Sequence, residues 1–188
     1  MILRAFIAMT PPTTLQYTVA EVREAFQPLQ VPWRWVTPTQ IHLTLKFLGN
    51  VPAEQVTIIA QAMECAAQGQ TAFTLRAQSL GCFPHPSRPR VLWVGLTDPS
   101  QALAHLNERL TAALLPVGFA PEDRPLHPHL TLARAQNVGR SGALWPILQT
   151  CHNRHFGDFS VTQLHLLQSQ LQREGARHSL LHSTTLQS

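Results

Sequence analysis

Apolar and polar residues alternate in two short segments of the chain, and this alternation predicts two half-buried strands. From Ile41 to Phe47 every second residue is apolar, and the segment from Leu126 to Arg134 repeats the pattern. Each segment contains the tetrapeptide His-Leu-Thr-Leu, which begins at His42 in the first and at His129 in the second. Because strand side chains alternate between faces, each His shares the polar face of its strand with the Thr two residues later.

The rest of the hydrophobic pattern predicts helices and further strands around these two segments. Apolar residues recur every three or four positions in three stretches, which predict helices over residues 13–29, 52–67 and 99–115. A short helix is predicted over 141–151, and strands over 2–9, 73–81, 91–96, 159–167 and 178–186. The proline-rich, basic stretch 83–90 is predicted to be a loop near the substrate.

The order strand, motif strand, helix occurs twice, and this duplication predicts the architecture. A half-polar strand does not suit a parallel sheet covered on both faces, so antiparallel sheets are favoured. We expect an α+β, bilobal fold in which two pseudo-symmetric antiparallel sheets face a central cleft, with helices on the outer faces. Residues 1–188 are expected to form a single domain made of two similar lobes, and to act as a monomer.

Composition narrows the class of protein. An apolar fraction of 44% is that of a globular chain, and a net charge of +4 suits a polyanionic partner such as RNA without requiring one. The three cysteines are far apart and lack a C-x-x-C pairing, so neither a disulfide framework nor a cysteine zinc site is indicated. No apolar run approaches the roughly 20 residues that span a bilayer, so a cytoplasmic protein without a membrane partner is expected.

The repeated His-x-Thr unit favours phosphoryl chemistry. The imidazole and the hydroxyl lie about 6–7 Å apart along one strand face, so two facing strands surround a phosphate with an acid, a base and two hydroxyl donors, Thr44 and Thr131. Neither a metal nor a cofactor is required. Alternation places Lys46 on the motif face, where it could bind the RNA backbone. It places Arg134 on the opposite face unless the strand ends or bulges.

Several longer runs carry a resemblance to a known family. These runs are Arg4 to Ala8, Ile41 to Gly49, Pro89 to Gly95 and Pro128 to Arg134. With them the sequence resembles the 2H phosphoesterase superfamily, and within it the LigT-like RNA 2′,3′-cyclic phosphodiesterases of bacteria and archaea.

The resemblance implies hydrolysis of RNA 2′,3′-cyclic phosphate ends to 2′-phosphomonoesters. It implies that His42 is the proton donor, that His129 is the proton acceptor and that Arg134 binds the substrate together with both threonines. The late family pattern of Ser-x-Leu, Gly and Tyr has His178 in place of the Tyr.

Two other classes stay open. A basic module that binds RNA ends without catalysis, or a 2′-5′ RNA ligase-like protein, fits the positive charge and the arginines of the 83–90 stretch. A His-ligated metallohydrolase would use His127-x-His129 together with His152-x-x-His155. Turnover of a nucleoside 2′,3′-cyclic phosphate separates the enzyme from the binding module, and insensitivity to a chelator separates it from the metallohydrolase.

Overall fold

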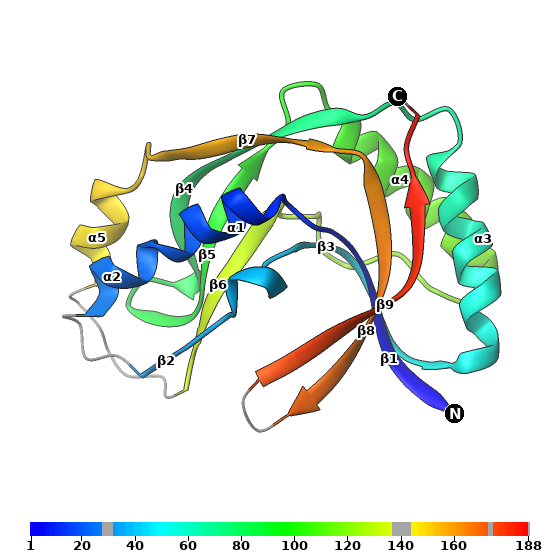
Figure 1. Ribbon diagram of the computed structural model, residues 1–188, viewed down its shortest axis with the longest axis horizontal. Helices are drawn as coiled ribbons and strands as arrows, with labels where there is room; N and C mark the ends of the chain where they lie inside the picture. Colours follow the sequence, from blue (N-terminus) through cyan, green and yellow to red (C-terminus); the bar gives the residue numbers. More distant parts are fainter. Residues whose placement is uncertain (28–31, 137–143, 173–174, 188) are drawn as a thin grey trace.

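The computed structural model describes residues 1–27, 32–136, 144–172 and 175–187, and Figure 1 shows how its elements are arranged. The strands are β1 (Ile2–Met9), β2 (Trp33–Trp35), β3 (Leu43–Pro52), β4 (Phe73–His85), β5 (Arg88–Thr97), β6 (His129–Ala135), β7 (His155–Val161), β8 (Gln163–Gln172) and β9 (Gly175–Thr185). The α-helices are α1 (Thr13–Ala20), α2 (Val22–Phe26), α3 (Val56–Ala67), α4 (Ala102–Leu114) and α5 (Leu144–Thr150).

The described strands form one curled antiparallel sheet that consists of two matching halves. Its order is β7-β4-β5-β6-β3-β1-β8-β9, with β2 paired to β6. The halves meet where β3 and β6 share one residue pair, Leu43 with Leu130. Outward from this pair, β3-β1-β8-β9 (the first lobe) mirrors β6-β5-β4-β7 (the second lobe). The expected α+β, bilobal fold is confirmed, and the two expected sheets are the halves of this one sheet.

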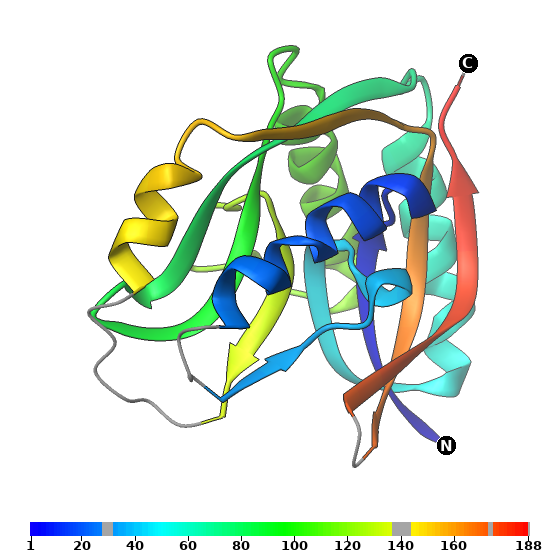
Figure 2. The ribbon, with the colours of Figure 1, turned by 60° about the vertical axis from the view of Figure 1, so that its left-hand side comes forward.

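Helices pack on one face of each half, which we call the helix-covered face. Figures 1 and 2 show α3 and α4 beside the first lobe, and α1, α2 and α5 beside the second. In the second lobe Trp33 and Trp35 of β2 contact the ring of Phe26 in α2. In the first lobe His182 of β9 lies 3.4 Å from Glu64 of α3. The opposite face carries the two His-x-Thr units and is called the motif face.

The β4–β5 hairpin is longer than expected. Phe83 pairs with Val91 and His85 with Arg88, so the predicted loop over 83–90 is wrong and only a short turn remains between the strands. Pro84 is tolerated in β4 because β4 pairs with β7 only as far as Gln78, so Pro84 lies beyond the ladder on that edge.

Other boundaries differ in smaller ways. The helix predicted over 13–29 divides into α1 and α2 at Glu21, and residues 28 and 29 lie outside the described part of the chain. The strand predicted over 159–167 is two strands, β7 and β8, and α5 covers the described part of the helix predicted over 141–151. Within the described ranges, no helix has the length and apolar character needed to cross a bilayer.

Candidate active site

The first motif strand contains a β-bulge at the last residue of its tetrapeptide. Thr44 pairs with Ala8 of β1, and Lys46 pairs with Ile7, so Leu45 is an extra residue without a partner. Paired residues of adjacent strands point to the same face, and neighbours along a strand point to opposite faces. Thr44 therefore lies on the motif face, and Lys46 is turned to the helix-covered face.

The second motif strand has the same bulge at the equivalent residue. Thr131 pairs with Trp93 of β5, and Ala133 pairs with Leu92, so Leu132 is the extra residue. Ala133 and Leu92 are fully buried on the helix-covered face. The two copies of His-Leu-Thr-Leu thus have the same backbone irregularity as well as the same sequence.

Lys46 does not share a face with His42 and Thr44, so that expectation is wrong. Its side chain is buried, and its ammonium group donates a hydrogen bond to the carbonyl oxygen of Ala120. Its nitrogen also lies 3.1 Å from a carboxylate oxygen of Glu122. The bulge at Leu45 is the physical reason, because it reverses the facing of Lys46 and Phe47, which follow it.

Arg134 lies on the motif face because of the bulge at Leu132. It pairs with Val91, which is two residues from Trp93 on the same face of β5. The charge of Arg134 also helps to lower the pKa of both His42 and His129, which places the guanidinium near the two imidazoles. Strand alternation placed Arg134 on the opposite face unless the strand ended or bulged, and the structure shows a bulge.

The two imidazoles are held in the same way. The Nδ1 atom of His42 lies 2.7 Å from the carbonyl oxygen of Gln40, and that of His129 lies 2.6 Å from the carbonyl oxygen of His127. A carbonyl oxygen only accepts hydrogen bonds, so Nδ1 carries the proton in both rings. The Nε2 atom of each ring is therefore the one that can accept or give a proton.

The strand register brings both His-x-Thr units to the junction of the lobes. Since the two motif strands are antiparallel and share the central leucine pair, His42 lies across from Thr131, and Thr44 lies across from His129. Two imidazoles and two hydroxyl groups thus occupy the motif face on both sides of this pair. The structure brings together these four residues and Arg134, and it leaves Lys46 apart.

Burial makes both imidazoles weak bases. It lowers the pKa of His42 from 6.5 to about 4, and the nearby charges of His178, Arg134 and His129 act in the same direction. Burial also lowers the pKa of His129, with smaller contributions from His127 and Arg134. The hydrogen bonds to the two backbone carbonyls oppose these effects only in part. Both rings are therefore neutral at pH 7 in the unliganded protein.

Aromatic rings flank both histidines, and the sequence alone did not indicate this. The ring centroids of Phe6 and His178 both lie 4.9 Å from that of His42. On the other side Phe83 lies 5.2 Å and Trp93 6.2 Å from His129. The sequence pattern did not identify these aromatic residues as part of the site, because aromatic residues in strands usually indicate core packing. His178, which stands where the family pattern has Tyr, is thus part of the site.

Gly81 makes room for the indole of Trp93. A Cβ atom built on Gly81 would lie 2.2 Å from atoms of the Trp93 ring, which is far closer than van der Waals contact allows. Gly81 pairs with Trp93 across the β4–β5 hairpin, so the ring lies over the backbone of Gly81 on the motif face. The glycine therefore positions one wall of the site beside His129.

The described residues do not form the metal site that a metallohydrolase would need. Among them, no three His, Cys, Asp or Glu side chains are grouped so as to hold an ion. His155, one of the four residues of that alternative, instead lies 2.7 Å from Asp158, whose carboxylate also binds Arg76. These exposed residues form an ion-pair cluster on β4 and β7.

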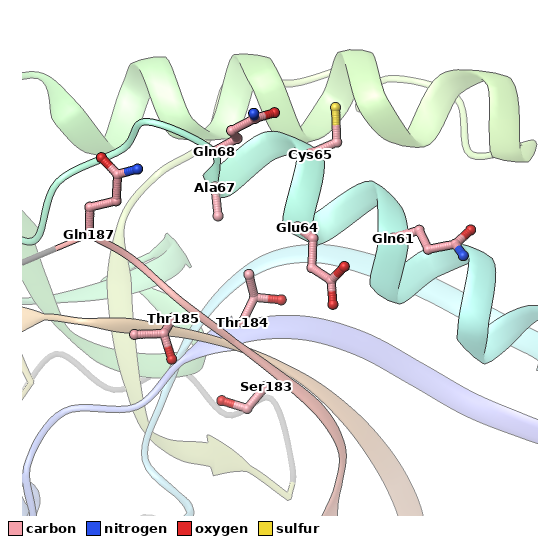
Figure 3. Close-up of a pocket in the computed structure, with 9 residues that line it drawn as sticks. All are labelled: Gln61, Glu64, Cys65, Ala67, Gln68, Ser183, Thr184, Thr185 and Gln187. Atoms are coloured by element: carbon pink, nitrogen blue, oxygen red, sulfur yellow. The ribbon is translucent and has the colours of Figure 1, made fainter.

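The hollow drawn in Figure 3 is separate from the two motif strands. It measures about 540 Å³ and lies between α3 and β9, where Glu64 points toward Thr184. Its walls are mostly amide and hydroxyl side chains, and none of the motif residues lines it. It belongs to the helix-covered side of the first lobe.

The geometry is that of a two-histidine phosphoesterase, and comparison with known proteins agrees. The model of the family described as LigT like Phosphoesterase matches residues 9–93 and again residues 94–178. The chain therefore belongs to the LigT like Phosphoesterase family, as the sequence resemblance implied. The two matched segments also agree with the duplication of the motif strands.

Relatives and solved structures cover three quarters of the chain or more. The RNA 2′,3′-cyclic phosphodiesterase of Aeropyrum pernix is 31% identical over 164 residues, which are 87% of this chain and 92% of the relative. That of Bacillus subtilis is 32% identical over 145 residues, 76% of this chain and 78% of the relative. A Thermus thermophilus structure has a TM-score of 0.82 at 26% identity and covers 97% of both chains. Escherichia coli LigT complexed with 3′-AMP has a TM-score of 0.75 at 27% identity and covers 100% of both.

Proposed function

We propose that the protein hydrolyses RNA 2′,3′-cyclic phosphate ends to 2′-phosphomonoesters, with His129 as general base and His42 as general acid. The observation that carries the proposal is the pair of imidazoles, each with its Nδ1 atom bound to a carbonyl oxygen and each facing a threonine of the other strand. Membership of the family and the names of the relatives support the choice of substrate.

The reaction needs one proton removed and one proton supplied. Nε2 of His129 takes a proton from water, whose oxygen attacks phosphorus. The bond from phosphorus to O3′ breaks, and Nε2 of His42 gives its proton to the departing O3′. The proton left on His129 returns to solvent, and His42 takes up a new one.

His42 needs the substrate in order to be an acid. Its pKa of about 4 in the unliganded protein leaves the ring neutral at pH 7, whereas a general acid must carry the proton. An anionic phosphate beside the ring favours the charged imidazolium and raises this pKa. Substrate binding thus supplies the charge that keeps the proton on His42 until the bond breaks.

Thr44, Thr131 and Arg134 bind the phosphate oxygens in this proposal. The hydroxyl groups donate hydrogen bonds from the two sides of the junction, and the guanidinium offers a charged donor from the same face. We leave Lys46 out, because its ammonium group is buried against Glu122 on the helix-covered face. One chain supplies both motifs, so a monomer suffices for the reaction, which uses neither a metal nor a cofactor.

A turnover experiment tests the proposal. Adenosine 2′,3′-cyclic phosphate is incubated in large excess over the protein, with and without a chelator. The products are separated and compared with authentic 2′-AMP and 3′-AMP. We expect many turnovers to 2′-AMP at a rate that the chelator does not change. Formation of 3′-AMP would contradict the assigned leaving oxygen, and binding without turnover would favour the RNA-end-binding module.

A further inference from the structure

His178 reaches the motif face because of a bulge in β9. Two consecutive residues of β8 pair with Leu180 and His182, which leaves Leu181 without a partner. His178 and His182 are therefore on opposite faces, although their spacing of four would place them on the same face of a regular strand. Figures 1 and 2 show that the β8–β9 hairpin bends along its length. His182 meets Glu64 of α3, and His178 meets His42.

The ring of His178 closes one side of the site. Its centroid lies 4.9 Å from that of His42 and 5.0 Å from that of Phe6, and both contacts are edge to face. The ring is half-buried, and in the described part of the chain no group forms a hydrogen bond with its nitrogens. An imidazole with available nitrogens thus lies directly beside the proposed general acid.

The groups that face His178 are cationic or neutral. It meets His42, which directly precedes β3 and whose pKa it helps to lower, and its partner on β8 is the neutral Ser169. Arg4 of β1 is exposed two residues from Phe6, on the same face. Across the junction, Arg134 and His129 act on His42 as well.

This arrangement lacks a counter-ion. Burial lowers the pKa of His178, and none of the facing side chains named above is a carboxylate. Arginine and histidine side chains grouped without a carboxylate favour an anion, because a bound anion stabilises the charged forms of these groups. The phosphate of the substrate has the charge that this cluster needs.

We propose that His178 is a third substrate-contacting histidine, whose protonated ring donates a hydrogen bond to an anionic phosphate oxygen of the RNA end beside His42. The inference rests on the proposed function, because it takes an RNA end as the occupant of the motif face. It adds a binding group that neither His-x-Thr unit contains. His178 holds the substrate, and it takes no part in the proton transfers at water and O3′.

The contact makes binding depend on pH in a definite direction. Only the protonated ring attracts the phosphate, and the phosphate in turn raises the pKa of His178 in the complex. The contribution of His178 to affinity is therefore complete below its pKa in the free protein. It is lost as the pH rises through its pKa in the complex.

The test compares His178→Gln with His182→Gln, a matched control on the same strand and the opposite face. The dissociation constant of adenosine 2′-monophosphate, which cannot turn over, is measured by calorimetry at pH 5.5 and pH 8.5. We expect His178→Gln to weaken binding about tenfold or more at pH 5.5, as loss of a charged hydrogen bond does, and little at pH 8.5. His182→Gln should bind like the unmodified protein at both values.

Each outcome of this test has a definite meaning. Equal weakening at both pH values, or none, overturns the proposal, because a packing role does not titrate. His178→Tyr keeps an aromatic ring against Phe6 and should show the same pH-selective loss, which guards against a folding defect of the Gln variant. If the loss of affinity is pH-selective but the unmodified protein does not turn over the cyclic phosphate, the binding role of His178 stands and the proposed function is rejected.

A second arm identifies the phosphate. KM is measured at pH 5.5 for adenosine 2′,3′-cyclic phosphate and for a dinucleotide that ends in a cyclic phosphate. If His178→Gln raises KM for both substrates, the ring contacts the cyclic phosphate itself. If it raises KM only for the dinucleotide, the ring contacts the phosphodiester upstream. No effect on either KM speaks against His178 as a substrate contact.

Discussion

The two motif strands have the same backbone but different side chains after the bulge. In the first lobe the bulge turns Lys46 to the helix-covered face and leaves Phe47 on the motif face, where it is 63% exposed. In the second lobe it buries Ala133 and leaves Arg134 on the motif face. Phe47 and Arg134 are thus structural equivalents, and the two halves of the site differ chemically at this position.

The two halves of a duplicated site need not act symmetrically. The first lobe buries its histidine beside the rings of Phe6 and His178, and the pKa of His42 falls to about 4. The second lobe adds the permanent charge of Arg134 close to its histidine. The same tetrapeptide therefore sits in two different electrostatic environments.

The largest expected effect comes from removing either imidazole. We expect His42→Ala and His129→Ala each to lower kcat by about 10²- to 10⁴-fold, because each residue transfers one proton in the proposed mechanism. Kinetics with the cyclic phosphate measure the effect, thermal melts check the fold, and His105→Ala, an exposed histidine on α4, is the control. A variant of either residue that keeps half the activity would contradict the proposed role of that histidine.

The threonines should show a smaller and more symmetric effect. Thr44→Val and Thr131→Val keep the shape and remove the hydroxyl donor, so we expect each to lower kcat/KM by about 10- to 100-fold, as loss of a charged hydrogen bond does. Thr74→Val, at an exposed strand position of β4, should leave kcat/KM unchanged. If only one motif threonine matters, the two hydroxyl groups do not share the phosphate.

Substitutions of Arg134 and Lys46 should have different effects, because the two side chains lie on opposite faces of the sheet. Arg134→Gln removes a charge from the motif face and is expected to raise KM about tenfold, with a weaker dependence on salt. Lys46→Met removes a charge from the helix-covered face and is expected to lower the free energy of unfolding by about 1–3 kcal/mol without changing KM. The reverse result would show that the bulge at Leu45 does not turn Lys46 away.

The pH profile should show the smallest effect, a displacement along the pH axis. The proposed mechanism requires neutral His129 and protonated His42, so kcat/KM should rise through one pKa and fall through the other. Both lie below 6.5 in the free protein, so the maximum of kcat/KM should lie below pH 6.5. Arg134→Gln removes a charge that lowers both and should move the whole profile to higher pH. A maximum above pH 7 in the unmodified protein contradicts this.

Strand alternation predicted the four motif residues, and it failed where the backbone departs from period two. Leu45, Lys46 and Phe47 continue the alternation in sequence, so nothing in the first copy reveals that Lys46 is buried and Phe47 exposed. In the second copy Leu132 and Ala133 are two apolar residues in succession, which is the pattern that a bulge produces.

The aromatic walls of the site depend on contacts between distant parts of the chain. Phe6 and His178 are far apart in the sequence and meet at His42 only because β1 and β8 are paired and the β8–β9 hairpin bends. Local patterns describe strands one at a time, and they contain no information on which strands become neighbours. The fold class followed from the duplication, and the surroundings of each histidine required the pairing.

The extra leucine in each tetrapeptide resets the two-residue reading frame of its strand. Counting from the histidine, position two holds the threonine and position five, rather than four, next faces the substrate side. Position five is Phe47 in one copy and Arg134 in the other, so it can vary while the tetrapeptide stays constant. Substitutions at position five can therefore change the chemistry of each half of the site separately.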